Sequence, residues 1–231
     1  MKTAVICAMP EEAEKLRSML TKTSSEQHAG TECTKGIFAG QEVVLCISDI
    51  GKANAAATTQ MVIDTFAPDI LLNIGLAGSC SPDLPISGVV VANRLMYHDF
   101  YLIFDEQSPF QSGFTPDEDL SERAAEACRA LDLVFKRGVV ATGDQFIADE
   151  DVKADIIERT EASCVEMEGA AIAHIAQKNG VPYASVKVMS DDASKEALED
   201  FYEVFSLGAY CERSAAIIGE ILRSLERSPR S

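Results

Sequence analysis

Residues 164–191, CVEMEGAAIAHIAQKNGVPYASVKVMSD, hold two regular elements that predict the class of fold. Residues 169–178 are rich in alanine and precede Asn179-Gly180, which predicts a helix that ends there. Residues 183–189 are mostly apolar, which is typical of a strand buried in a parallel sheet. With the extended segment before the helix, the stretch predicts a strand–helix–strand unit of an α/β fold.

Charged side chains within this unit point to a functional site. Glu166 and Glu168 are two residues apart on the predicted extended segment, so their side chains should share one side of it. Lys187 falls inside the apolar strand, where an unpaired charge is costly, and we expect it to pair with a carboxylate. The carboxylates of this stretch and Glu12 are the candidates, and the sequence does not select among them. The alternative is that Lys187 lies at the surface of an edge strand. Asp191 follows that strand directly.

Composition limits the possible partners. The 231 residues are 47% hydrophobic, which is enough to bury the core of a single domain over residues 1–231, with a tail from about 226 that we expect to fray. The formal net charge of −17 would repel a phosphate backbone, so we expect no nucleic-acid partner. No segment has the roughly 18 apolar residues of a membrane span, and the first apolar run is too short for a signal peptide.

Cysteine and histidine usage bears on location and metal binding. The seven cysteines form no CxxC pair and fall mostly in apolar segments, which is typical of buried thiols in a cytoplasmic protein. The three histidines have no ligand-type spacing relative to cysteine, so we expect no metal and no other cofactor.

Further elements follow from the hydrophobic pattern along the chain. We predict strands at 3–8, 42–48, 69–74, 88–92 and 136–142, and helices at 11–20, 53–66, 117–131, 149–159 and 207–225. Residues 22–40 suggest a loop and one strand of a hairpin, and the segment with Phe201, Tyr202 and Phe205 suggests a loop. The stretch 97–116 is irregular and aromatic, so we expect it to pack on a partner subunit or over a ligand.

Residues suited to ligand binding follow the ends of at least four predicted strands. These are Glu11-Glu12, the segment 75–78, Phe146-Ile147 and Asp191. In open α/β sheets the carboxyl ends of the strands form the ligand-binding edge. The small residues at 75–79 let a ligand approach the backbone, but they do not form a GxGxxG motif, so a nucleotide phosphate site is not supported.

Six segments together resemble one family. They are AMPEE at 8–12, IGKANAA at 50–56, NIGLAGS at 73–79, TGDQFI at 142–147, VEMEGAAIAH at 165–174 and SDDA at 190–193. This set resembles the methylthioadenosine/S-adenosylhomocysteine nucleosidases of the purine nucleoside phosphorylase superfamily, over nearly the whole chain. The resemblance implies a single α/β domain in which helices flank a central twisted mixed β-sheet. It also implies a homodimer whose residues 97–116 help close the neighbouring site.

The resemblance also implies roles for individual residues in cleaving the bond between adenine and ribose. Asp191 would protonate adenine N7, Glu12 would activate water, and Glu168 would hold the ribose hydroxyls while Met167 packs on the sugar. Phe146 would stack on adenine, whose edge the backbone of Ile147 would read. Lys187 would supply a supporting charge. The remaining wall would consist of Met9, Ile50, Ala77, Gly78, Ser190 and Phe201.

Three alternatives stay open from the sequence. A phosphorylase would hold a phosphate dianion, which the Glu11-Glu12 pair would repel. A nucleosidase for another purine nucleoside, such as futalosine, would differ only around the 5′ substituent. A binding protein without catalytic activity is the third, because Leu76 stands where some members have serine and Lys187 stands where arginine is expected. Lysine is a point charge rather than a two-pronged donor, so it would position water less rigidly.

Overall fold

Nine strands form one mixed sheet in the computed structural model, which describes residues 1–100 and 112–227. The strands are β1 Lys2–Cys7, β2 Thr21–His28, β3 Thr31–Phe38, β4 Gln41–Ile47, β5 Ile70–Ser79, β6 Val89–Tyr97, β7 Phe135–Thr142, β8 Ala162–Glu166 and β9 Tyr183–Asp191. The helices are α1 Pro10–Met19, α2 Lys52–Phe66, α4 Glu118–Ala130, α5 Glu150–Thr160, α6 Gly169–Lys178, α7 Ala197–Leu207 and α8 Ala209–Arg227. The predicted α/β fold with a central mixed sheet is confirmed.

The order of the strands brings distant parts of the chain together. The sheet runs β2-β3-β4-β1-β5-β8-β7-β6-β9, and β9 also pairs in parallel with β5. Five strands, from β5 through β8, β7 and β6 to β9, therefore close on themselves. The closing pair of β6 and β9 is antiparallel, whereas β6 and β7 are parallel. This closure gives β9 a neighbour on each side, so β9 is not an edge strand.

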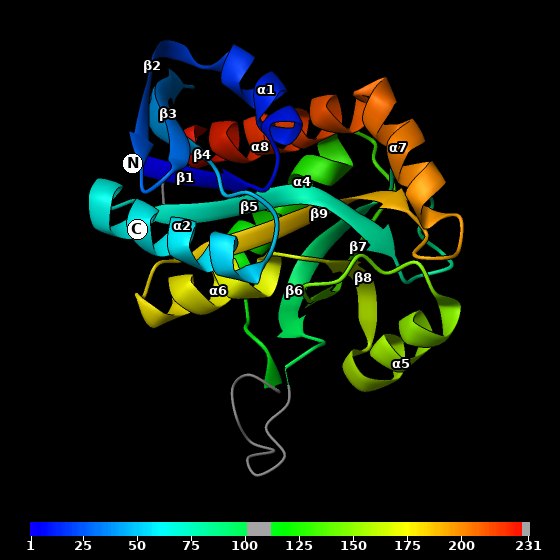
Figure 1. Ribbon diagram of the computed structural model, residues 1–231. Coiled ribbons are helices and arrows are strands. Elements are labelled where there is room, and N and C mark those ends of the chain that lie inside the picture. Colours follow the sequence, from blue (N-terminus) through cyan, green and yellow to red (C-terminus); the bar gives the residue numbers. More distant parts are fainter. Residues whose placement is uncertain (101–111, 228–231) are drawn as a thin grey trace.

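Helices cover both faces of the sheet (Figure 1). Helices α1, α4 and α8 pack on one face, and α2 and α6 pack on the other. Strand β5 shows the two-residue alternation that this layering requires, because Leu72 and Ile74 belong to the first core and Leu71 and Ala77 belong to the second. No helix in the described ranges is long and apolar enough to cross a membrane.

Two predicted boundaries near the centre of the sheet are wrong. β5 continues through the small residues to Ser79 instead of ending at 74, because β9 and β8 pair with this extension. β8 ends at Glu166, so Glu168 does not lie on an extended segment. The backbone turns there because the Glu166 side chain accepts the N–H groups of Glu168 and Gly169.

Two outer segments also differ from the prediction. Residues 22–40 form two antiparallel strands, β2 and β3, instead of one strand and a loop. The predicted loop around Phe201 is helix α7, and Gly208, with a φ of 63°, separates α7 from α8. In the predicted aromatic stretch, Tyr101, Phe104, Pro109 and Phe110 lie outside the described residues.

Candidate active site

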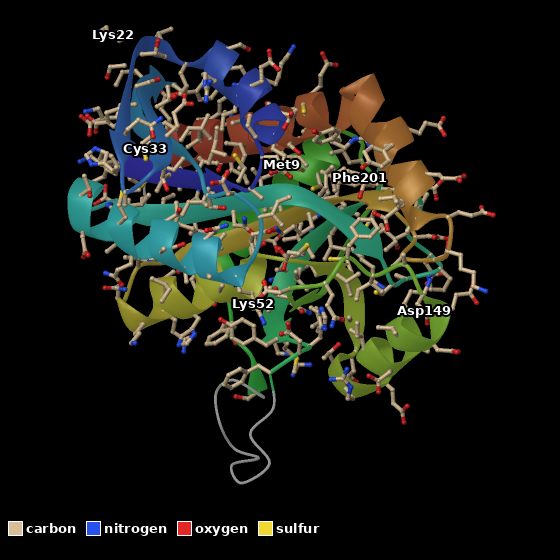
Figure 2. The ribbon with its side chains drawn as sticks, in the orientation of Figure 1. Met9, Lys22, Cys33, Lys52, Asp149 and Phe201 are labelled. Carbon is tan, nitrogen blue, oxygen red and sulfur yellow. The ribbon has the colours of Figure 1, made fainter. Side chains whose placement is uncertain are left out.

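A cavity opens where the carboxyl ends of β1, β5, β7, β8 and β9 meet. All side chains that the sequence predicted to be catalytic or to bind substrate contribute to its lining, whereas Lys187 lies behind it. In the view of Figure 2, Met9 and Phe201 lie on one side of β5 and Lys52 lies on the other. The lining comprises Ala8, Met9, Glu12, Ile50, Leu76, Ala77, Gly78, Gln145, Phe146, Ile147, Val165, Glu166, Met167, Glu168, Ser190, Asp191 and Phe201.

Glu12 is held at the first turn of α1 by backbone donors. Its Oε2 accepts the N–H groups of Ala8 and Met9 at 2.8 and 3.0 Å, and its Oε1 accepts the Leu76 N–H at 3.0 Å. Burial raises the pKa of Glu12, although these hydrogen bonds and the charge of Lys187 act to lower it. A methyl group on Gly75 would lie 2.9 Å from Oε1, so a glycine here makes room for the carboxyl group.

Asp191 is held at the end of β9. Its Oδ2 accepts the Ser190 hydroxyl at 2.7 Å, and its Oδ1 accepts the Ala193 N–H at 2.9 Å. The residue is 2% exposed, and burial raises the pKa of its carboxyl group, with a smaller contribution from the negative charge of Asp192. Asp191 can therefore keep a proton at a higher pH than an exposed aspartate can.

Glu168 faces the cavity from the start of α6. Its Oε1 accepts the N–H of Gly51 at 2.8 Å. Burial, together with the negative charge of Glu166, raises the pKa of Glu168 to about 8. Near neutral pH this carboxyl group is therefore mostly protonated and can donate a hydrogen bond to a ligand as well as accept one.

Lys187 pairs with Glu166, a carboxylate of the same strand–helix–strand unit. The Nζ of Lys187 lies 2.8 Å from Oε2 of Glu166, and both side chains are 2% exposed. The expectation of a carboxylate partner is confirmed, and the partner comes from the same stretch; Glu12 and Glu168, which were also candidates and lie within the described residues, form no ion pair with Lys187. Burial acts to raise the pKa of Glu166, yet the positive charge of Lys187 and the hydrogen bonds it accepts lower it. This pair is therefore ionised.

Aromatic and aliphatic side chains form the mouth of the cavity. Phe146 is 45% exposed, and its ring meets that of Phe201 edge to face, with 5.8 Å between centroids. Ile50, in the segment between β4 and α2, is 52% exposed, and Ile147 is buried. The exposed apolar area at this mouth suits a flat, partly apolar ligand.

An ion cluster at the rim fixes the segment that carries Gly51. Lys52 Nζ lies 2.5 Å from Oδ1 of Asp99 and 3.6 Å from Oδ2 of Asp144. Asp144 Oδ1 accepts the Lys52 N–H at 2.9 Å, and Asp99 Oδ2 accepts the Asp144 N–H at 2.9 Å. This cluster is not evident in the sequence, because its members lie far apart in the chain and each resembles an ordinary surface charge.

Comparisons with known proteins place the chain in a family. The family model of the phosphorylase superfamily matches residues 2–223. A 5′-methylthioadenosine/S-adenosylhomocysteine nucleosidase of Bacillus pumilus is 36% identical over 208 residues, which are 87% of this chain and 90% of that protein.

Two solved structures are also similar. One is the 5′-methylthioadenosine/S-adenosylhomocysteine nucleosidase of Neisseria meningitidis in complex with methylthio-immucillin-A, with a TM-score of 0.92, 31% identity and coverage of 97% of this chain and 99% of that one. The other is the futalosine hydrolase of Helicobacter pylori, with a TM-score of 0.91, 30% identity and coverage of 97% and 98%. The chain belongs to the phosphorylase superfamily and, within it, to the family of methylthioadenosine/S-adenosylhomocysteine nucleosidases, which are N-glycosyl hydrolases.

Proposed function

We propose that this protein hydrolyses the N-glycosidic bond of 5′-methylthioadenosine, S-adenosylhomocysteine or both, and releases adenine and a 5-thio-substituted ribose. One observation carries the proposal: four carboxyl groups, those of Glu12, Glu166, Glu168 and Asp191, line one cavity beneath an aromatic mouth. The names of the similar proteins point to the same substrates.

Asp191 acts as the general acid. As the bond to ribose breaks, electrons flow into adenine, and protonation of N7 makes adenine a better leaving group. A buried carboxyl group with a raised pKa is suited to hold that proton until it is needed. The Ala193 N–H and the Ser190 hydroxyl fix the orientation of the group and stabilise its anion after transfer.

Glu12 acts on the other face of the sugar. The departure of adenine leaves a ribose with cationic, oxocarbenium-like character, and a water molecule attacks it from the side opposite the base. Glu12 orients this water and accepts its proton. The three N–H groups that Glu12 accepts keep its carboxyl group in one orientation.

The remaining contacts bind the nucleoside. Glu168 bonds the ribose hydroxyls, and Met167 packs on the sugar. Phe146 stacks on the adenine ring, and the N–H and C=O groups of Ile147 read its edge. Met9, Ile50 and Phe201 lie toward the 5′ substituent.

The carboxyl groups favour hydrolysis over phosphorolysis. A phosphate dianion beside the ribose would face the Glu12 carboxylate in a buried site, where repulsion between like charges is strong. Water carries no charge and does not meet this barrier. We therefore propose that the reaction needs no phosphate.

A second candidate substrate is futalosine, because the fold is almost as similar to the futalosine hydrolase of Helicobacter pylori. The two proposals share the chemistry and differ only at the 5′ group. Turnover of 5′-methylthioadenosine, S-adenosylhomocysteine and futalosine by the purified protein separates them. The main proposal predicts the highest kcat/KM for 5′-methylthioadenosine and S-adenosylhomocysteine. A clear preference for futalosine would instead support futalosine as the substrate.

Two further expectations belong to this proposal. We expect a cytoplasmic enzyme that forms a homodimer, in which the stretch 97–116 helps close the neighbouring site. Sedimentation analysis of the purified protein tests the dimer directly.

A further inference from the structure

Glu168 occupies the N-cap position of α6, yet its side chain does not cap the helix. The first N–H groups of a helix have no partner inside it, and the residue at this position is ordinarily a short polar one, such as serine or aspartate, whose side chain accepts one of them. Glu168 instead accepts the N–H of Gly51 and faces the cavity. Another group must therefore satisfy the start of α6.

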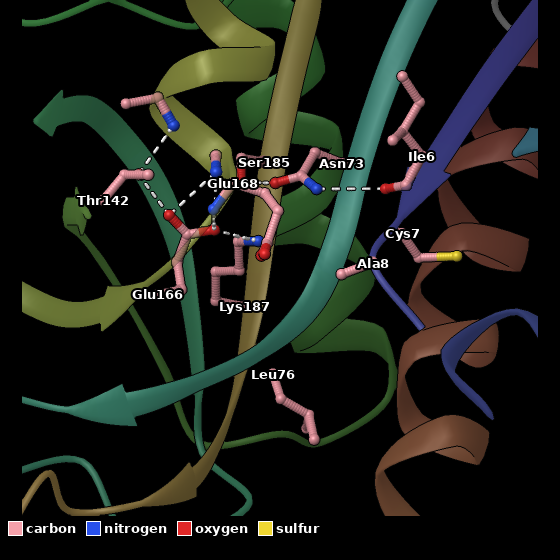
Figure 3. A network of polar contacts seen from close by, with 12 residues as sticks. Ile6, Cys7, Ala8, Asn73, Leu76, Thr142, Glu166, Glu168, Ser185 and Lys187 are labelled. Atoms are coloured by element: carbon pink, nitrogen blue, oxygen red, sulfur yellow. Dashed lines mark hydrogen bonds and ion pairs between the residues drawn. The ribbon is translucent and has the colours of Figure 1, made fainter. Parts of the chain in front are cut away.

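Glu166 and Thr142 take over the capping. Glu166 accepts the N–H groups of Glu168 at 3.1 Å and of Gly169 at 2.7 Å. The Thr142 hydroxyl accepts the Ala170 N–H at 2.8 Å and donates to Glu166. Figure 3 shows Glu166 between Thr142 and Lys187, at the start of the helix.

The local packing leaves room for this arrangement only with glycine at the first helical position. A methyl group on Gly169 would lie 2.9 Å from Cδ2 of Leu95 and 3.1 Å from Oε1 of Glu166. Lys187 balances the charge of Glu166 from the other side. The oxygens of Glu166 are thus occupied by the helix, by Thr142 and by Lys187, although the residue contributes to the lining of the cavity.

We propose that Glu166 is a positioning residue that caps α6 in place of Glu168 and so directs the Glu168 carboxyl group into the cavity. The role of Glu168 toward substrate rests on the proposed function, but its orientation and titration can be measured without substrate. The negative charge of Glu166 also favours the protonated form of Glu168. The other charged groups that act on Glu168 are Lys187, which opposes this effect, and Glu12, which adds to it.

The test is the substitution Glu166→Gln, which keeps the shape of the side chain and removes its charge. The carboxyl carbons of ¹³C-glutamate-labelled, ligand-free protein are titrated by NMR, and Glu168→Gln identifies the signal of Glu168. We expect the midpoint for Glu168 to lie near 8 in the parent protein. In the variant it should fall by about one pH unit or more, because a neighbouring negative charge is lost.

Hydrogen exchange tests the capping itself. The amides of Gly169 and Ala170 should exchange about fivefold faster or more in Glu166→Gln, because one capping bond is weakened. The control is Asp117→Asn, which likewise replaces a capping carboxylate with an amide, at the start of α4, where Asp117 accepts the Leu120 N–H at 3.0 Å. This control should leave both the titration of Glu168 and the exchange at α6 unchanged.

A second variant guards against misfolding, because Glu166→Gln leaves Lys187 buried without its charged partner. The double substitution Glu166→Gln with Lys187→Met removes both charges and should still lower the midpoint of Glu168, by a smaller amount. Unchanged titration and unchanged exchange in the variants that fold would overturn the proposal. If the parent protein failed to release adenine while these shifts occurred, the proposed function would fail and the role of Glu166 would stand.

Discussion

Gly78 and Asp191 lie so close together that a methyl group on Gly78 would be 2.7 Å from Oδ1 of Asp191. The two residues are paired in the register of β5 and β9, so this distance is set by the sheet. Gly78→Ala must therefore displace the carboxyl group that we propose as the general acid.

We expect Gly78→Ala to lower kcat by about 10²-fold, because displacing a reacting group by about 1 Å can cost that much. The measurement is steady-state adenine release. Gly219→Ala is the control, because Gly219 lies within helix α8, away from the cavity, and a methyl group there would approach only side-chain atoms, the nearest being Cε of Met19 at 3.1 Å. Turnover should be unchanged in this variant. A Gly78→Ala enzyme with the parent kcat would contradict the proposed placement of the acid.

Asp191→Asn should remove the general acid and keep the shape of the site. We expect turnover to fall by about 10²–10⁴-fold, the usual contribution of such a group. Calorimetric binding of an adenine nucleoside analogue should still be measurable. Near-normal turnover in this variant would rule out the proposed mechanism.

Glu12→Gln tests the base and its backbone donors together. Both oxygens of Glu12 accept N–H groups, and the amide group of glutamine can accept with only one oxygen. We expect a loss of turnover and a decrease of about 1–3 kcal/mol in the free energy of unfolding, because a buried donor loses its partner. Urea denaturation and adenine release measure the two effects, and full activity would exclude Glu12 as the base.

The buried pair of Lys187 and Glu166 should matter for stability in a way that a surface pair does not. Lys187→Met leaves a buried charge unpaired, and we expect a loss of about 3–5 kcal/mol in the free energy of unfolding. The control is Lys15→Met. The ion pair between Lys15 and Glu212 is exposed and should contribute less than about 1 kcal/mol to the free energy of unfolding. Equal losses in the two variants would show that the buried pair is not ionised.

The raised pKa of Glu168 predicts how stability varies with pH. Between its ordinary value of 4.5 and about 8, the folded protein holds this proton and the unfolded chain has released it. The contribution of Glu168 to the free energy of unfolding therefore decreases as pH rises through this range. Glu168→Gln should remove this part of the slope in denaturation curves measured from pH 5 to 8.5, and an unchanged slope would show that the pKa of Glu168 is not raised.

Much of the fold and of the cavity lining could be predicted from the sequence, because strand ends are a local signal. Met9 and Phe146 follow the ends of β1 and β7, and Asp191 ends β9, so these residues come to one edge of the sheet in any parallel α/β arrangement. The partner of Lys187 could not be predicted, because Glu12, Glu166 and Glu168 are all near this edge and only the pairing of strands selects among them.

Other features depend on contacts between distant segments. Gly75 and Gly78 were interpreted as space for a ligand, and the structure shows that methyl groups there would collide with Glu12 and Asp191. The first distance depends on the pairing of β5 with β1, and the second depends on the register of β5 and β9, so neither can be derived from the sequence.

Helix α7, by contrast, has a local signal in the sequence. Leu198, Phe201 and Phe205 follow the i, i+3, i+7 spacing of a helical apolar stripe, and the prediction of a loop overlooked this spacing.

The central claim is tested most directly by incubating the purified protein with 5′-methylthioadenosine, with and without phosphate, and identifying both products. The account predicts free adenine and free methylthioribose at the same rate in both conditions. Release of adenine only with phosphate, with formation of a ribose 1-phosphate, would contradict hydrolysis. No release of adenine in either condition would contradict the assigned substrate.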